Sequence, residues 1–146
     1  MQPIVISTII LGHFAAKIFP VLNDFEKYPL FVPGFREARI THRGADGAYQ
    51  SISKVRIIGF TEKLHSRTDT QEPYRIHTTS TGRWFIKNFL TTWELHDVGD
   101  GCRISLSTTI ILRNELDNVP TISTVKQKIA SQTLTAFEER IHALLD

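Results

Sequence analysis

Two kinds of hydrophobic periodicity divide the chain into a strand-rich part and a helical end. Residues 4–11 are rich in β-branched side chains, which predicts a first strand. Apolar residues then recur at helical spacing, with Pro20 and Pro29 as breakers, which predicts two short helices. From about residue 36 the period is two, and turn residues separate six further strands, predicted near 36–44, 48–58, 60–69, 74–81, 89–97 and 102–113.

The last strand and the segment after it give the clearest signals. Gly99-Asp100-Gly101 predicts a hairpin turn, and the strand that follows has one mostly apolar and one mostly polar face. Residues 119–145 carry an apolar stripe that predicts a long amphipathic helix. The pattern therefore indicates an α+β fold, in which a curved seven-stranded antiparallel sheet wraps around a long C-terminal helix. One helix cannot cover the whole apolar face, so we expect a cavity beside it, with the two short helices as a lid.

Length, composition and charge limit the classes of protein to which the chain can belong. The chain has 146 residues, of which 41% are hydrophobic, and this size predicts a single domain over residues 1–146. A formal charge of +2, with scattered Lys and Arg, argues against a nucleic-acid partner. Cys102 is the single cysteine, so no internal disulfide is possible. We expect a cytoplasmic protein, because the start lacks a signal-peptide pattern and no apolar stretch is long enough for a membrane span.

Motifs for bound cofactors are missing from the sequence. The histidines lack a metal-ligand spacing such as H-x-x-x-H, so we expect no metal. No G-x-G-x-x-G, phosphate loop or G-x-S-x-G is present, which argues against nucleotide binding and serine hydrolysis. We therefore expect no cofactor.

Three segments carry a family resemblance. Residues 23–34, Asn-Asp-Phe-Glu-Lys-Tyr-Pro-Leu-Phe-Val-Pro-Gly, resemble the D-x-E-x-Y-P-x-F-x-P segment of the polyketide cyclase/coenzyme Q-binding family. Residues 81–85 and 90–95 look like its G-x-F…W-x-F element, and residues 136–140 are similar to its A-F-E-x-R. The segments occur in the family's order over nearly the whole chain. The resemblance implies the helix-grip fold of the START-like (Bet v 1-like, SRPBCC) superfamily.

The resemblance implies a hydrophobic or aromatic small molecule bound in an internal cavity, with two main activities. As a polyketide cyclase of the aromatase/cyclase type, the protein promotes aldol ring closure and dehydration of a polyketide intermediate. As a coenzyme Q or lipid carrier, it binds without chemistry. A ribosome-associated, toxin-like factor is a third possibility within the family.

The candidate catalytic residues lie on the strand near 60–69. The resemblance places Arg67 at the position of an active-site arginine in the tetracenomycin-type aromatase. A guanidinium would stabilise a developing enolate or alkoxide, and His65 on the same strand face would shuttle a proton. Lys63 would extend this polar row. Alternatively, Phe60 and Leu64 on the opposite face point to the core, and the three cationic residues are solvated.

Aromatic residues supply the other ligand-binding candidates. Trp93 either stacks on a planar ligand or is plain core, and Trp84 either caps the cavity or contacts a partner. Two positions depart from the aromatase pattern, since Phe35 replaces a tyrosine and Thr78 a second arginine. We expect the ligand to be bound by Phe31, Val32, Phe35, Lys63, Ile76, Thr78, Trp84, Trp93, Ile129 and Thr133.

A protein partner is a further expectation. Lys87, Lys126 and Lys128 offer a basic surface to an acidic acyl-carrier protein that delivers the substrate. The sequence is compatible with a monomer or a homodimer.

Overall fold

The structure is a computed structural model that describes residues 2–146. Seven strands form one antiparallel sheet, as predicted, and their order in the sheet is β1-β7-β6-β5-β4-β3-β2. The strands are β1 (Ile4–Leu11), β2 (Phe35–Arg43), β3 (Tyr49–Ile57), β4 (Phe60–Gln71), β5 (Arg75–Thr81), β6 (Ile86–Val98) and β7 (Gly101–Leu112).

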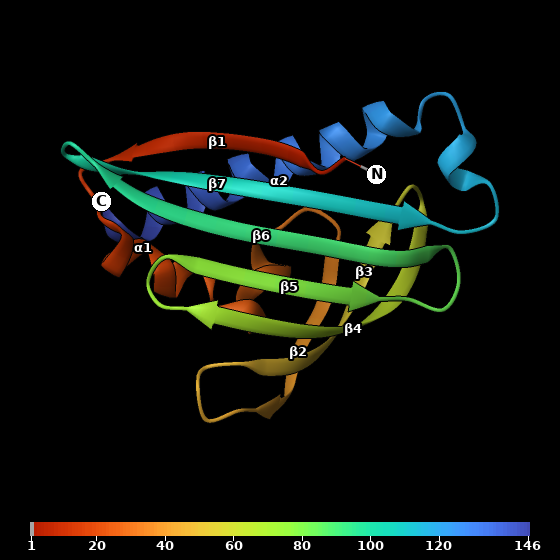
Figure 1. Cartoon of the computed structure of the whole chain (residues 1–146), viewed down its shortest axis with the longest axis horizontal. Helices are drawn as coiled ribbons and strands as arrows, with labels where there is room; N and C mark the ends of the chain where they lie inside the picture. Colours follow the sequence, from red (N-terminus) through yellow and green to blue (C-terminus); the bar gives the residue numbers. More distant parts are fainter. Residues whose placement is uncertain (1) are drawn as a thin grey trace.

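The sheet curves around a single long helix (Figure 1). This helix is α2 (Ile122–Leu145), and it follows the short 3-10 helix η2 (Leu116–Asn118). Two short helices connect β1 to β2, namely α1 (Ala15–Leu22) and the 3-10 helix η1 (Phe25–Leu30). The face of the sheet toward α2 is called the inner face below, and the opposite one the outer face. No helix within residues 2–146 is long and apolar enough to cross a membrane.

A tight turn before β4 and a bulge at the start of β6 help to set which side chains face inward. Ile58 and Gly59 both have positive φ, at 57° and 81°, and join β3 to β4 by a two-residue turn. A register shift between Ile86 and Asn88 interrupts the β6–β7 pairing. Because of this bulge, Ile86 and Trp93 can both be buried although an uninterrupted strand would put them on opposite faces. The strand predicted near 89–97 therefore begins three residues earlier.

Pro20 does not break the first short helix. It lies inside α1, two residues before the helix ends. Proline removes one hydrogen-bond donor, and in a helix this short that loss affects a single late turn. Two short helices form as predicted, but Pro20 as a breaker between them is wrong.

Aromatic contacts join the three family-like segments. The Phe137 ring, near the middle of α2, lies 5.1 Å from that of Tyr28 and 5.0 Å from that of Phe31. The Arg140 guanidinium lies 5.0 Å from the centre of the Phe31 ring, a cation–π contact. Trp93 approaches Phe137 from β6 at 4.9 Å. These rings pack η1 against α2 and the sheet.

Candidate ligand-binding cavity

A small cavity lies between the inner face of the sheet, η1 and α2. Its volume is about 70 Å³. Aromatic, aliphatic and hydroxyl side chains line it, and no charged side chain within residues 2–146 does. The lining residues are Phe25, Tyr28, Val32, Phe35, Ser53, Leu64, Ser66, Ile76, Thr78, Ser80, Phe89, Thr91, Trp93, Leu106, Thr108, Ile129, Thr133 and Phe137.

The hydroxyl groups form rows across the inner face of the sheet. Thr68, Thr78, Thr91 and Thr108 are direct partners on β4, β5, β6 and β7. Neighbouring strands lie about 4.8 Å apart, so this threonine row places oxygen atoms at regular steps along the cavity floor. A second row pairs serines on β3, β4 and β5, of which Ser66 and Ser80 line the cavity.

Paired hydroxyls keep hydrogen-bonding capacity for a ligand. Ser66 Oγ and Ser80 Oγ lie 2.7 Å apart, and Thr68 Oγ1 and Thr78 Oγ1 lie 2.8 Å apart. In each pair one hydroxyl donates to the other, and the second proton stays available. Both serines line the cavity and either could donate it to a ligand oxygen, whereas the threonine pair could do so only through Thr78, because Thr68 does not line the cavity.

Two further hydroxyl groups of the lining are committed to the protein. The Tyr28 hydroxyl donates to the Leu22 carbonyl oxygen, and the Thr133 hydroxyl donates to the Ile129 carbonyl oxygen at 2.7 Å. Burial raises the pKa of Tyr28 well above its usual value, helped by Tyr49 and Asp24 nearby. The phenol is neutral at physiological pH, so it is no general base there.

A second hollow of about 200 Å³ lies beside the cavity and forms its mouth. Four side chains line both spaces and separate them, and these are Phe35, Phe89, Ile129 and Thr133. Arg56 and Lys128, both exposed, lie at the mouth. Small-molecule pockets usually measure about 300–1,000 Å³. A ligand must therefore displace this partition and join the two spaces.

The predicted catalytic residues do not face the cavity. Lys63, His65 and Arg67 are exposed on the outer face of β4, and the Arg67 side chain is 65% accessible. Its Nη2 donates to Asp69 Oδ1 at 3.3 Å. Strand alternation turns Leu64 inward and the cations outward. The expectation that Arg67, His65 and Lys63 lie in the cavity is wrong, and the solvated interpretation of this face holds.

A charged residue on the inner face of β4 has a structural role instead. Glu62 is buried, and its carboxylate accepts backbone N–H bonds from Trp84 at 2.6 Å, Phe85 at 3.1 Å and Ile86 at 2.9 Å. Three such bonds compensate the burial of a carboxylate. Glu62 therefore fixes the loop between β5 and β6, and it was not singled out from the sequence.

Two predicted aromatic contacts lie elsewhere. Trp84 is 72% exposed and borders a surface hollow with Lys63 and His65, so its expected place over the cavity is wrong. The alternative, a contact between Trp84 and a partner, stays a prediction. Phe31 packs on Phe137 behind the lining and does not itself border the cavity.

Seven of the predicted ligand-binding residues do line the cavity, and their contact with a ligand stays a prediction. They are Val32, Phe35, Ile76, Thr78, Trp93, Ile129 and Thr133. The hydroxyl residues Ser53, Ser66, Ser80, Thr91 and Thr108 were not predicted. The signal for them was present, because each alternates with outward residues on its strand.

The predicted basic surface is smaller than expected. Lys126 is buried, and its Nζ lies 2.7 Å from Asp117 Oδ1, an ion pair that joins α2 to η2. Lys87 and Lys128 are exposed. Lys126 as part of an exposed surface for an acidic partner is therefore wrong.

Comparison with protein families identifies the family of the chain. The family model described as polyketide cyclase / dehydrase and lipid transport matches residues 11–138. The chain belongs to this family. No curated protein matches it significantly.

Solved structures share the fold at low sequence identity. A START superfamily protein from Mycobacterium smegmatis is 18% identical, with 99% of each chain covered and a TM-score of 0.85. The Zhui aromatase/cyclase from Streptomyces sp. R1128 is 14% identical, with 99% of this chain and 97% of that chain covered and a TM-score of 0.81. A protein from Thermus thermophilus is 15% identical over 99% of both chains, with a TM-score of 0.83. These similarities confirm the helix-grip fold.

Proposed function

We propose that the protein binds one hydrophobic small molecule that carries several carbonyl or hydroxyl oxygens, and holds it without covalent chemistry. The observation that supports this most is the cavity lining, where apolar and aromatic side chains surround neutral hydroxyl groups. Burial of apolar surface would drive binding, and the hydroxyl groups would orient the ligand.

The arrangement of the hydroxyl groups favours a ligand with more than one oxygen. The threonine row crosses four adjacent strands, so its oxygens are spread along the floor and not gathered at one end. Thr68 and Thr78 bond to each other, but a fatty chain with a single polar head would offer at most one partner to the other hydroxyl groups of the row, which is costly in an apolar space. A quinone or a polyketone would pair with several of them.

Binding must open the partition at the mouth. Phe35 and Phe89 are only partly buried, and Ile129 and Thr133 are partly buried on α2. Side-chain rotation at these positions would merge the cavity with the mouth and make room for a molecule of quinone size.

Tryptophan fluorescence tests the proposal. Trp93 lines the cavity and Trp84 is exposed on the other side of the sheet, so the variant Trp84→Phe leaves a single reporter inside. Ubiquinone-1 should quench this variant in a saturable way. The matched variant Trp93→Phe, which keeps only Trp84, should show unsaturable collisional quenching. Equal quenching in the two variants contradicts binding in the cavity.

Polyketide cyclisation is a second candidate, favoured by the family to which the chain belongs. The threonine row could hold successive ketones of a polyketide in one folded shape, and confinement would promote aldol closure. Hydroxyl donors would stabilise the developing oxyanion, without Arg67 or His65. An acidic acyl-carrier protein could deliver the chain near Lys128 at the mouth.

Product analysis separates cyclase from carrier. The protein is added to a reconstituted minimal polyketide synthase, which by itself releases a mixture of spontaneously cyclised products. A cyclase should shift that mixture toward one ring-closure product, and Thr91→Val should reduce the shift. An unchanged mixture, together with saturable quenching by ubiquinone-1, excludes the cyclase and leaves the carrier.

A further inference from the structure

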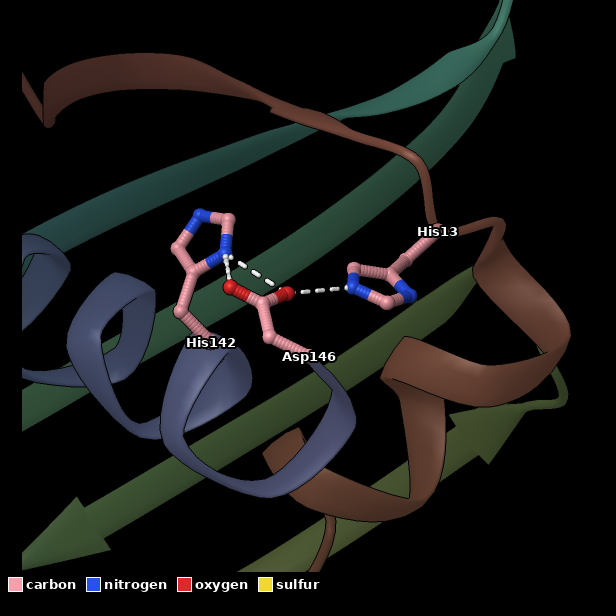
Figure 2. A network of polar contacts seen from close by, with 3 residues as sticks. All are labelled: His13, His142 and Asp146. Atoms are coloured by element: carbon pink, nitrogen blue, oxygen red, sulfur yellow. Dashed lines mark hydrogen bonds and ion pairs between the residues drawn. The ribbon is translucent and has the colours of Figure 1, made fainter.

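Three potential metal ligands meet outside the cavity, although they come from the two ends of the chain (Figure 2). His13 lies in the turn between β1 and α1, and His142 lies in the last turn of α2. Asp146 follows His142 by one helical turn. One ligand atom from each residue can be chosen so that all three lie within 4.8 Å of one another.

The Asp146 carboxylate lies between the two imidazole rings (Figure 2). His13 Nε2 is 2.7 Å from Asp146 Oδ1, and His142 Nδ1 is 2.9 Å from Asp146 Oδ2. An aspartate carboxylate is ordinarily charged at neutral pH, as a metal ligand must be.

The two histidines sit on fixed parts of the fold. The Gly12 N–H donates to the Asp100 carbonyl oxygen at 2.9 Å, and the Ala15 N–H donates to Asp97 Oδ1 at 2.8 Å. These bonds hold the turn that carries His13 on both sides. His142 follows Ile141, which is fully buried on α2. Asp146 is exposed and can change its rotamer.

We propose that His13, His142 and Asp146 bind a divalent transition-metal ion, with Zn²⁺ the best match. Two imidazoles and one carboxylate are a usual protein ligand set for Zn²⁺, and water completes the tetrahedron. Ca²⁺ and Mg²⁺ prefer oxygen ligands, so two imidazoles select against them.

The required movement is small. With metal–ligand bonds of about 2.0–2.1 Å, the ligand atoms of a tetrahedral ion lie roughly 3.3 Å apart. The three atoms span up to 4.8 Å, so they must draw together by roughly 1.5 Å. Rotation of Asp146 out from between the rings would let both imidazoles close on the ion.

A bound ion would cross-link the turn before α1 to the end of α2. The three ligands converge only in the folded chain, because His13 and His142 lie at opposite ends of the sequence. Metal binding should therefore raise the melting temperature. This site is separate from the cavity lining, so it does not depend on the proposed ligand.

Calorimetric titration of the full chain with ZnCl₂ tests the site, with any purification tag removed and the protein stripped with EDTA. The wild type should bind one ion with micromolar or tighter affinity and gain thermal stability. His13→Ala, His142→Ala and Asp146→Asn should each bind at least roughly tenfold more weakly, since even indirect supports of a metal site change affinity by that much. His65→Ala, an exposed histidine elsewhere, is the matched control.

Co²⁺ provides an independent readout. Tetrahedral Co²⁺ with nitrogen and oxygen ligands absorbs visible light far more strongly than hydrated Co²⁺, so the wild type should gain a visible band that His13→Ala lacks. The proposal is overturned if the wild type binds no Zn²⁺, or if the three variants bind it as tightly as His65→Ala. The three side chains would then form only a hydrogen-bonded clasp.

Discussion

The two faces of β4 differ in both charge and burial. Leu64, Ser66 and Thr68 on the inner face are neutral and buried, whereas Lys63, His65 and Arg67 on the outer face are cationic or titratable and exposed. Seven consecutive residues, 62–68, thus point alternately to the interior and to the solvent. A family resemblance can therefore locate a strand correctly in the sequence. Which of its side chains face the cavity is decided separately, by the alternation of side chains along the strand.

Residues on the inner face of β4 have two different roles, one structural and one in lining the cavity. Glu62 lies at the start of β4, where its carboxylate binds the loop between β5 and β6. Leu64, Ser66 and their neighbours line the cavity. The described part of the chain therefore places no charged side chain in the cavity, even though one acid points inward.

Removal of the inner carboxylate should have the largest effect. Glu62→Ala leaves three loop N–H groups without their acceptor in a buried place, so we expect a loss of about 3–5 kcal/mol in the free energy of unfolding. Chemical denaturation measures it. Glu94→Ala, which removes an exposed glutamate from the outer face of β6, should cost less than about 0.5 kcal/mol. Similar losses in the two variants would contradict the role of Glu62.

Neighbouring residues on β4 give the next contrast. Leu64→Ala should cost about 2–4 kcal/mol, because it removes a buried side chain and leaves a void beside Phe35 and Phe85. His65→Ala, one position along the strand, should change stability by less than about 0.5 kcal/mol. Thermal or urea unfolding of the pair checks the assignment of faces. A larger loss for His65→Ala would reverse it.

Hydroxyl groups on the inner face should affect the ligand more than the fold. Thr91→Val keeps the shape and removes one donor in the middle of the threonine row. We expect about a two- to tenfold weaker affinity for ubiquinone-1, which corresponds to one neutral hydrogen bond. Thr109→Val on the outer face of β7 is the control and should leave the dissociation constant unchanged. Equal affinities in both variants would show that the hydroxyl group of Thr91 does not contribute to ligand binding.

The smallest effect is predicted for the residue that the family resemblance favoured most. Arg67→Ala should leave the affinity for ubiquinone-1 and the stability within about 0.5 kcal/mol of wild type, because its guanidinium faces solvent and pairs with the exposed Asp69. Fluorescence titration in the Trp84→Phe background measures the affinity. A large loss would mean that a ligand reaches the outer face.

The fold could be predicted because its signals are local and repeated. Alternation marked the strands, and the apolar stripe marked α2, which spans 122–145 against a predicted 119–145. The start of β6 was missed because its bulge breaks the alternation at Ile86 and Asn88. The prediction that Pro20 breaks the first helix was wrong for a different reason, because a helix of eight residues tolerates the loss of one hydrogen-bond donor near its end.

The site was harder to predict because it depends on orientation and on distant contacts. Phe60 and Leu64 suggested that one face of the strand is the core face, whereas Arg67 and His65 suggested the other. The first face is the buried one, and it includes Glu62. The carboxylate of Glu62 can be buried because it accepts hydrogen bonds from a loop more than twenty residues away. Trp84 is exposed because that loop is fixed while its indole points outward. His13 and His142 have no recognisable spacing along the chain, so only the fold brings them together.

Intermolecular nuclear Overhauser effects between unlabelled ubiquinone-1 and methyl-labelled protein test the central claim most directly. The account predicts contacts from the ligand to the methyl groups of Leu64, Ile76, Thr91 and Leu106, which line the cavity. It predicts none to Thr79, Thr109 or Ile111 on the outer face. Contacts confined to those outer methyl groups would contradict binding between the sheet and α2.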